Sequence, residues 1–407
     1  MTATSNHTPI KLRAGARTET GVQSPPRDMP LRVLIVPDKF KGTLSAAQAA
    51  SAIAKGWSKA RPNDLLRTLP MNEGGDGFGA ITADYLKAEV RETDTVDAAQ
   101  RACRSRWWFQ AADRIAIIEA AQVNGLAQLP KGLYHPFDLD TRGLGKVLRE
   151  AHQAGARHCL IGLGGSATND AGFGLATSLG WRFVTGSGSY IQTWTGCSEL
   201  VSLIPPETQL SFESFQVAVD VQNPLLGPEG CSRIYGPQKG LTPADMPLAD
   251  AALQRIADCV DRAQGSGRKV HHVPGAGAAG GLGFGFVAFT GALLTPGFDL
   301  FAKLSGLEAA LGECDLVVTG EGMIDTSSLM GKGVGGILTA CKARSLPCIG
   351  LAGHLGNGIQ DVGGFLRLAS LTQRTSPALA MVNAEAWLEI VAQEVAGTLD
   401  GEVAEAG

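Results

Sequence analysis

Two strand–loop–helix units follow one another near the start of the chain and limit the folds it can adopt. Residues 31–36 (LRVLIV) form a buried-strand pattern, and residues 45–60 form an amphipathic helix whose first residue, Ser45, begins a capping box. Residues 65–70 predict a second strand, which leads through a glycine-rich loop into a helix ending at Leu86. Consecutive units of this kind imply a parallel sheet, so the chain is predicted to be an α/β protein.

A glycine-rich stretch at residues 160–174 (LIGLGGSATNDAGFG) repeats this pattern in a concentrated form. A short apolar strand ends at Leu163, and the pair Gly164-Gly165 permits a sharp turn. The helix that follows is predicted to begin near Ala171, and helix N-termini bind anions such as phosphate. An ordinary capped turn explains this stretch equally well. The polar residues between turn and helix are Ser166, Thr168, Asn169 and Asp170.

Composition excludes several classes of function. A length of 407 residues suits about two domains, and a net charge of −4 without a basic stripe argues against nucleic-acid binding. The eight cysteines include no C-x-x-C pair, which favours reduced thiols in the cytoplasm over a disulfide framework. No apolar run is long enough to span a membrane. Residues 1–30 are predicted to be a disordered extension, with a transit peptide as the weaker alternative.

Acidic residues recur beside the glycine turns, at positions where parallel strands would end. Hard oxygen ligands at such places suit Mg²⁺, which typically binds one or two carboxylates together with substrate phosphates. We expect about half of these acids to cap helices or turns instead. The acids are Glu73, Asp76, Asp170, Asp220, Glu321 and Asp325.

Three lysines, Lys41, Lys239 and Lys332, stand beside glycines, where an ammonium group can reach a phosphate. An exposed lysine is the default interpretation for any one of them. Glycine turns, acids and lysines together fit phosphoryl transfer, which depends on metal, cations and positioning.

The sequence GAGAAG at residues 275–280 matches the dinucleotide fingerprint G-x-G-x-x-G, with Asp299 about 20 residues further on. The predicted strand before it, residues 270–274, is short and contains two histidines and a proline. An NAD-dependent oxidoreductase is therefore an alternative, while tight helix packing explains the glycines as well. The chain has no Walker-type phosphate loop.

Several motifs in a fixed order resemble the bacterial-type glycerate kinase family. They cover nearly the whole chain from residue 31 to the last predicted helix. In order, they are PDKFKGTLSA, GGSATNDAG, NPLLGPEG with GPQKG, PGAGAAGGLGFG, and TGEGMID followed by GK.

The resemblance implies two α/β domains. One is a flavodoxin-like parallel-sheet domain formed by residues 31–88 and 290–400, and the other is an inserted α/β domain formed by residues 89–289. The implied activity is ATP- and Mg²⁺-dependent phosphorylation of D-glycerate, most often at the 2-hydroxyl. The implied partner is a small hydroxy acid, and the protein could be a monomer or a homodimer.

The sequence differs from the common family pattern in three places. Residues 73–78 read EGGDGF where the family commonly has DGGEGT, so the two acids exchange lengths and Phe78 replaces a hydroxyl. Ser327 and Ser328 stand where Gln-Thr is common, and Lys39 stands where a serine is usual. These changes keep open a shifted substrate choice or a non-catalytic, hydroxy-acid-binding relative.

The predicted site lies in a cleft between the two domains. Asp76, Asp170 and Asp220 compete for the role of general base, and Lys41 is predicted to neutralise phosphate or a substrate carboxylate. Asp220, Glu321 and Asp325 are predicted to hold Mg²⁺ or its waters. The predicted substrate and phosphate contacts are Asp38, Lys41, Glu73, Gly164, Gly165, Ser166, Thr168, Asn169, Lys239, Gly275, Gly277, Gly280, Gly281 and Lys332.

Overall fold

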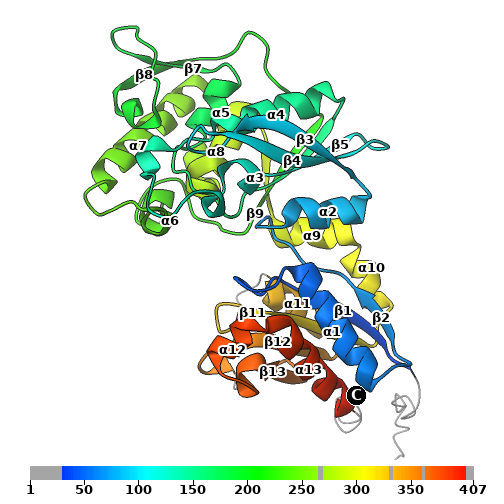
Figure 1. Ribbon diagram of the computed structural model, residues 1–407. Coiled ribbons are helices and arrows are strands. Elements are labelled where there is room, and N and C mark those ends of the chain that lie inside the picture. Colours follow the sequence, from blue (N-terminus) through cyan, green and yellow to red (C-terminus); the bar gives the residue numbers. More distant parts are fainter. Residues whose placement is uncertain (1–29, 265–268, 330–332, 360–362, 400–407) are drawn as a thin grey trace, which may run out of the picture.

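The computed structural model describes residues 30–264, 269–329, 333–359 and 363–399. It has two lobes, each built on its own sheet (Figure 1). Lys332 and nearly all of the expected N-terminal extension lie outside the described residues. In the described part of the chain, no helix combines the length and the apolar character needed to cross a bilayer.

The lower lobe contains a five-stranded sheet in which every neighbouring pair is parallel. Read from one edge, its order β2-β1-β11-β12-β13 is the flavodoxin order 2-1-3-4-5, which confirms the predicted α/β class. The strands are β1 (Arg32–Pro37), β2 (Leu65–Thr68), β11 (Leu316–Ile324), β12 (Cys348–Leu355) and β13 (Arg367–Ser370).

Helices cover both faces of this sheet, as its buried, nearly all-apolar strands require. Helices α1 (Ala46–Ala60) and α13 (Ala384–Gly397) share one core with β1, β11 and β12, and the predicted capping box of Ser45 and Gln48 is present. The opposite core contains α10 (Leu307–Gly312) and α11 (Gly333–Lys342). Helix α12 (Pro377–Val382) packs beside α13.

The upper lobe contains a six-stranded mixed sheet with the order β10-β9-β6-β5-β4-β3. The four strands from β10 to β5 are parallel, whereas β4 and β3 are antiparallel additions at the edge. The strands are β3 (Glu89–Val96), β4 (Ala102–Gln110), β5 (Ile115–Glu119), β6 (His158–Gly162), β9 (Ser214–Val219) and β10 (Leu293–Pro296).

Helices α2 (Phe78–Leu86) and α9 (Gly297–Ser305) pack on the face of this sheet that lies toward the lower lobe (Figure 1). Helices α4 and α8 cover the opposite face. The remaining upper-lobe elements are α3 (Ala121–Asn124), α4 (Arg142–Gln153), α5 (Phe173–Ser178), β7 (Arg182–Thr185), β8 (Leu200–Ile204), α6 (Cys231–Lys239), α7 (Met246–Gln264) and α8 (Ala278–Thr290).

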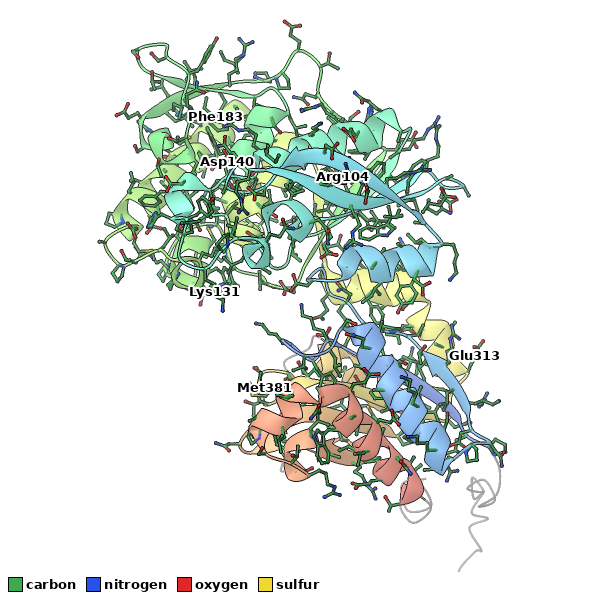
Figure 2. All side chains as sticks on the ribbon, viewed as in Figure 1. Arg104, Lys131, Asp140, Phe183, Glu313 and Met381 are labelled. Carbon is green, nitrogen blue, oxygen red and sulfur yellow. The ribbon has the colours of Figure 1, made fainter. Side chains whose placement is uncertain are left out.

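Two segments assigned to the flavodoxin-like domain from the sequence belong to the other sheet. Helix α2 packs on β4 and β5, and β10 pairs with β9. Because both lie beyond the predicted boundaries at 88 and 290, we propose that the inserted domain begins near Phe78 and ends near Ser305. Figure 2 shows the side chains of the two lobes, with Asp140 in the upper one and Glu313 in the lower one.

Candidate active site

Two carboxylates stand at the point where the strand order of the lower sheet reverses, between β1 and β11. Asp38 directly follows β1, and its backbone N–H donates to the Gly320 carbonyl of β11 at 2.8 Å. Glu321 comes next in β11. Ligands of open α/β sheets bind outside the carboxyl ends of the strands at this switch point.

Carboxylates of the two lobes approach one another here. Burial raises the pKa of Asp38, and the charge of Asp220, at the end of β9 in the upper sheet, raises it further, while neighbouring Lys39 lowers it. Burial also raises the pKa of Glu321 to about 7, with further increases from Asp38 and Glu73, although a hydrogen bond from Ser328 opposes them. Asp38 thus lies within electrostatic reach of Asp220 and Glu321, and Glu321 within reach of Glu73, and these four residues form the acid cluster.

The acidic loop before α2 lies against the Gly164-Gly165 turn. The Gly164 N–H donates to the Gly74 carbonyl at 2.8 Å, and a Cβ on Gly164 would lie 2.3 Å from Gly75 Cα. Asp76 belongs to the same contact, since its Oδ1 lies 2.4 Å from the Cβ position of Gly165. Glycine is needed on both turns because no side chain fits between them.

Glu119, at the end of β5, was missed by the sequence analysis. It is buried, and its two carboxylate oxygens accept hydrogen bonds from the N–H groups of Gly77 (3.1 Å) and Gly79 (3.0 Å). Burial raises its pKa, and these two bonds oppose the shift. Glu119 thus fixes the start of α2 and the acidic loop. Glu119 could have been found by the sequence feature that pointed to Asp38, which is an acid at the end of an apolar strand.

Phe78 replaces a hydroxyl of the common family pattern, yet it does not face the acids. Its ring is 2% exposed and packs in the core between α2 and the upper sheet. A Cβ on Gly162 would lie 2.6 Å from that ring, so the absence of a side chain at Gly162 accommodates the aromatic group.

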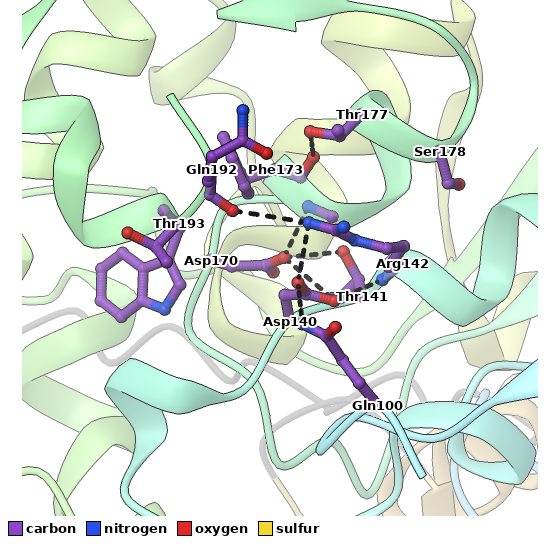
Figure 3. Close-up of polar contacts among 12 residues, drawn as sticks. Gln100, Asp140, Thr141, Arg142, Asp170, Phe173, Thr177, Ser178, Gln192 and Thr193 are labelled. Atoms are coloured by element: carbon purple, nitrogen blue, oxygen red, sulfur yellow. Dashed lines mark hydrogen bonds and ion pairs between the residues drawn. The ribbon is translucent and has the colours of Figure 1, made fainter. Parts of the chain in front are cut away.

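Asp170 is not available as a general base. The carboxylate is fully buried and accepts hydrogen bonds from Thr141 N–H (2.9 Å), Thr141 Oγ1 (2.8 Å), Gly174 N–H (2.9 Å) and Gly172 N–H (3.2 Å). Burial, aided by the charge of Asp140, raises its pKa to about 6. Figure 3 shows this network, in which Asp170 joins the beginnings of α4 and α5.

The turn after β6 also differs from the sequence prediction. Ala171 and Gly172 have positive φ values of 50° and 74°, so the helix begins only at Phe173 and is six residues long. Asp170 occupies the N–H groups at its start, which removes the predicted anion site of this helix. The part of the turn that remains for ligands is Gly164, Gly165 and Ser166.

The residues of the GAGAAG sequence do not form a dinucleotide site. Residues 270–272 form a 3₁₀-helix, so the predicted strand is wrong, and the Gly277 N–H donates to the Asn223 carbonyl at 2.9 Å. A Cβ on Gly280 would lie 1.9 Å from the Thr168 carbonyl oxygen. Gly275 and Gly281 also face protein atoms of the same lobe, so these glycines serve packing.

Two further predicted residues, Lys41 and Asp325, lie in different surroundings. Lys41 is exposed, and its backbone N lies 3.0 Å from the Cβ position of Gly322 in β11, which places it on the rim of the acid cluster. Asp325 instead caps its own turn, because its Oδ1 accepts from the N–H groups of Ser327 (2.8 Å) and Ser328 (3.1 Å). The hydrogen bond from the Ser327 hydroxyl is the main cause of the lowered pKa of Asp325.

The predicted set of three metal-binding carboxylates is not assembled. Among the residues that the structure describes, no three His, Cys, Asp or Glu side chains lie close enough to hold a metal ion by themselves. Asp220 and Glu321 supply hard carboxylate oxygens, the ligand type that Mg²⁺ binds together with substrate phosphates. Burial raises the pKa of Glu321 and so disfavours its charged form, which a bound cation would stabilise.

Two lobes with an acid-rich junction at a switch point define an α/β enzyme of the phosphotransferase type. A model of the glycerate kinase family matches residues 33–400. The chain belongs to this family.

Characterised relatives agree over most of their length. The chain is 34% identical to the glycerate kinase of Bacillus subtilis over 91% of this chain and 98% of the relative. It is 34% identical to the glycerate 2-kinase of Escherichia coli over 82% and 87%. A solved structure of a glycerate kinase 2 from Salmonella typhimurium matches with a TM-score of 0.77 at 33% identity, covering 92% of this chain and 99% of that one.

Proposed function

We propose that the protein transfers the γ-phosphoryl group of ATP to the 2-hydroxyl of D-glycerate, forming 2-phosphoglycerate and ADP. The observation that carries the proposal is the convergence of Asp38, Asp220 and Glu321 from both lobes at the switch point of a flavodoxin-order sheet. The similarity to a glycerate 2-kinase supports the choice of substrate and position.

We assign Asp76 as the general base and Asp220 with Glu321 as the residues that would hold Mg²⁺. Asp76 lies beside Gly165 on the turn that remains for ligands, so it can accept the proton of a hydroxyl bound there. Asp220 is exposed and lies near Asp38 of the opposite lobe. The ion, when bound, would neutralise charge that develops on the phosphate oxygens.

Cations and backbone groups would position the phosphates. Lys41 stands on the rim of the acid cluster and can reach a phosphate from solvent. Lys332 is assigned the same role from its place in the family motif. Proton transfer to Asp76 would accompany formation of the new P–O bond, while the bond between the γ-phosphorus and the ADP oxygen breaks.

Purified protein incubated with D-glycerate, ATP and Mg²⁺ tests the proposal directly. ³¹P NMR should show 2-phosphoglycerate and ADP in equal amounts. Formation of 3-phosphoglycerate would overturn the assigned position. No ADP release above a control without glycerate would favour another hydroxy acid or the non-catalytic alternative. The packed glycines speak against the oxidoreductase alternative, which tight NADH binding would revive.

We also propose a cytoplasmic setting. The eight cysteines are all free, and seven of them are buried, as suits a reducing compartment. Size-exclusion chromatography with light scattering would distinguish the monomer from the homodimer.

A further inference from the structure

Lys239, the last residue of α6, is a buried cation in the upper lobe. Lys239 is only 7% exposed. Its ammonium donates to the Thr168 carbonyl at 2.7 Å and to Ser166 Oγ at 3.3 Å. Within the described ranges of the chain, no carboxylate forms an ion pair with it. Both of its partners are neutral groups of the turn that follows β6.

A buried charge without a counter-ion is expensive, and the protein retains it only if something else compensates. Burial lowers the pKa of Lys239 to about 8, while the nearby Cys231 and Asp170 raise it. Asp170 cannot serve as a close partner because its carboxylate is engaged by Thr141, Gly172 and Gly174. The positive charge of Lys239 therefore lies against the buried side of the Ser166–Thr168 turn, where its hydrogen-bond partners are neutral groups.

Two buried amide oxygens beside this turn also lack a donor. Oδ1 of Asn124 and Oδ1 of Asn169 have no hydrogen-bond partner among the described residues, although both side chains are fully buried. Their NH₂ groups are anchored, one on Thr168 Oγ1 at 3.4 Å and the other on Ser232 Oγ at 2.9 Å. These two oxygens are sealed from solvent, so the group near this turn that an anion can complement is the ammonium of Lys239.

We propose that Lys239 and Ser166 form the subsite for the carboxylate of the hydroxy acid, so that the inserted domain holds the acid. The proposal rests on the proposed function. Ser166 is also only 7% exposed, and the adjacent Gly165 is the exposed residue of the same turn. Asp76 touches the adjacent Gly165, which puts the assigned base next to the carboxylate subsite.

Substitutions at the subsite should separate the two substrates. Lys239→Met and Ser166→Ala should raise KM for D-glycerate about 10-fold or more and leave KM for ATP within about twofold. Lys239→Arg should recover part of the loss, because it restores the charge. Lys146→Met is the matched control, since Lys146 is exposed on α4 of the same lobe and should leave both constants unchanged.

Binding of D-glycerate without nucleotide, measured by calorimetry between pH 6.5 and 9.5, gives an independent readout. Wild-type affinity should weaken as Lys239 deprotonates above about pH 8, and Lys239→Met should bind weakly at every pH. The other titratable groups facing Lys239 are Asp170, with a pKa near 6, and Cys231, with a pKa near 11, so neither mimics this transition.

The subsite is wrong if Lys239→Met or Ser166→Ala weakens ATP instead of glycerate, or if glycerate binding is unchanged in both. A thermal melt shows whether Lys239→Met folds, and Ser166→Ala, a smaller change, tests the subsite if it does not. Failure of the wild-type protein to phosphorylate any hydroxy acid would overturn the proposed function. The calorimetric pH profile would still decide whether this turn binds a carboxylate.

Discussion

Glu73 Oε1 accepts a hydrogen bond of 2.7 Å from the backbone N–H of Gly333, the first residue of α11. The contact joins the acidic loop, which leads into α2 of the upper lobe, to a helix N-terminus of the lower lobe. A carboxylate at such a position is stabilised by the helix dipole, by up to about 2 kcal/mol when it is partly buried. The two lobes are thereby connected beside the acid cluster.

Glu73→Gln should loosen the start of α11. The neutral amide keeps a weaker hydrogen bond and loses the interaction with the dipole, so we expect amide exchange in a peptide beginning at Gly333 to become about 3- to 10-fold faster. Hydrogen-exchange mass spectrometry measures this change. Glu385→Gln, which removes only the exposed pair with Lys55, is the control. Unchanged exchange in Glu73→Gln would mean that the contact does not hold the helix in solution.

Asp76→Asn and Asp220→Asn should fail in different ways. Loss of a general base typically lowers kcat about 10²- to 10⁴-fold, so Asp76→Asn should show this loss with an unchanged Mg²⁺ requirement. Asp220→Asn should instead raise the Mg²⁺ concentration for half-maximal rate about 10-fold. Steady-state kinetics over a Mg²⁺ series measures both effects. The opposite pattern would exchange the two assignments.

Glu321 should make Mg²⁺ binding depend on pH. Its pKa, raised to about 7 mainly by burial, means that the carboxylate is half protonated near neutrality. A proton must leave before the metal binds, so apparent Mg²⁺ affinity should rise from pH 6 to pH 8 and then level off. In Glu321→Gln, affinity should be weaker and nearly independent of pH over this range. A wild-type profile that is flat from pH 6 to 8 would contradict the assignment of Glu321.

The raised pKa of Glu321 also makes the stability of the fold depend on pH. The direction is opposite to that of a carboxylate whose pKa is lowered by an ion pair. Because the folded state binds the proton more tightly than the unfolded state does, the free energy of unfolding should fall as pH rises from about 4.5 to 7. Glu321→Gln should remove this part of the pH dependence. Denaturant unfolding at pH 5 and pH 7.5 measures the difference between the two proteins.

Gly280→Ala should be far more damaging than Gly291→Ala. Both glycines have φ of 70°, so alanine is strained by about 1 kcal/mol at either position. Only at Gly280 would the new Cβ also meet a backbone atom, the Thr168 oxygen at 1.9 Å, whereas nothing lies within 4 Å at Gly291. We expect a loss above about 3 kcal/mol for Gly280→Ala, measured by thermal unfolding. Equal losses would contradict the close packing of the two turns.

Patterns within a short stretch of sequence predicted the fold well. The apolar strand at 31–36 and the capped helix at 45–60 form as expected, and Asp38 lies directly after the first strand. The predicted boundaries of the inserted domain were less accurate, because α2 and β10 resemble any helix and strand until their partners in space are known.

Contacts between distant residues were beyond the reach of such patterns. Asp170 has the residue type and setting of a catalytic base, and only the hydrogen bonds from Thr141 show that it is a buried cap. The glycines of GAGAAG satisfy a cofactor motif, yet Gly280 is required by the Thr168 carbonyl of another turn. Glu119 was missed because its donors, Gly77 and Gly79, lie some 40 residues away along the chain.

The pairing of β1 with β11 has a consequence for the order of folding during synthesis of the chain. Arg32, the first residue of β1, hydrogen-bonds to Asp315, the residue before β11, and 283 positions separate these residues in the chain. During synthesis, β1 leaves the ribosome long before its central partner exists. Prior folding of the inserted domain would bring the two ends of that segment together and spare most of the entropy of closing so long a loop. In that order of events, the flavodoxin-like sheet would be completed last, after the upper lobe has folded.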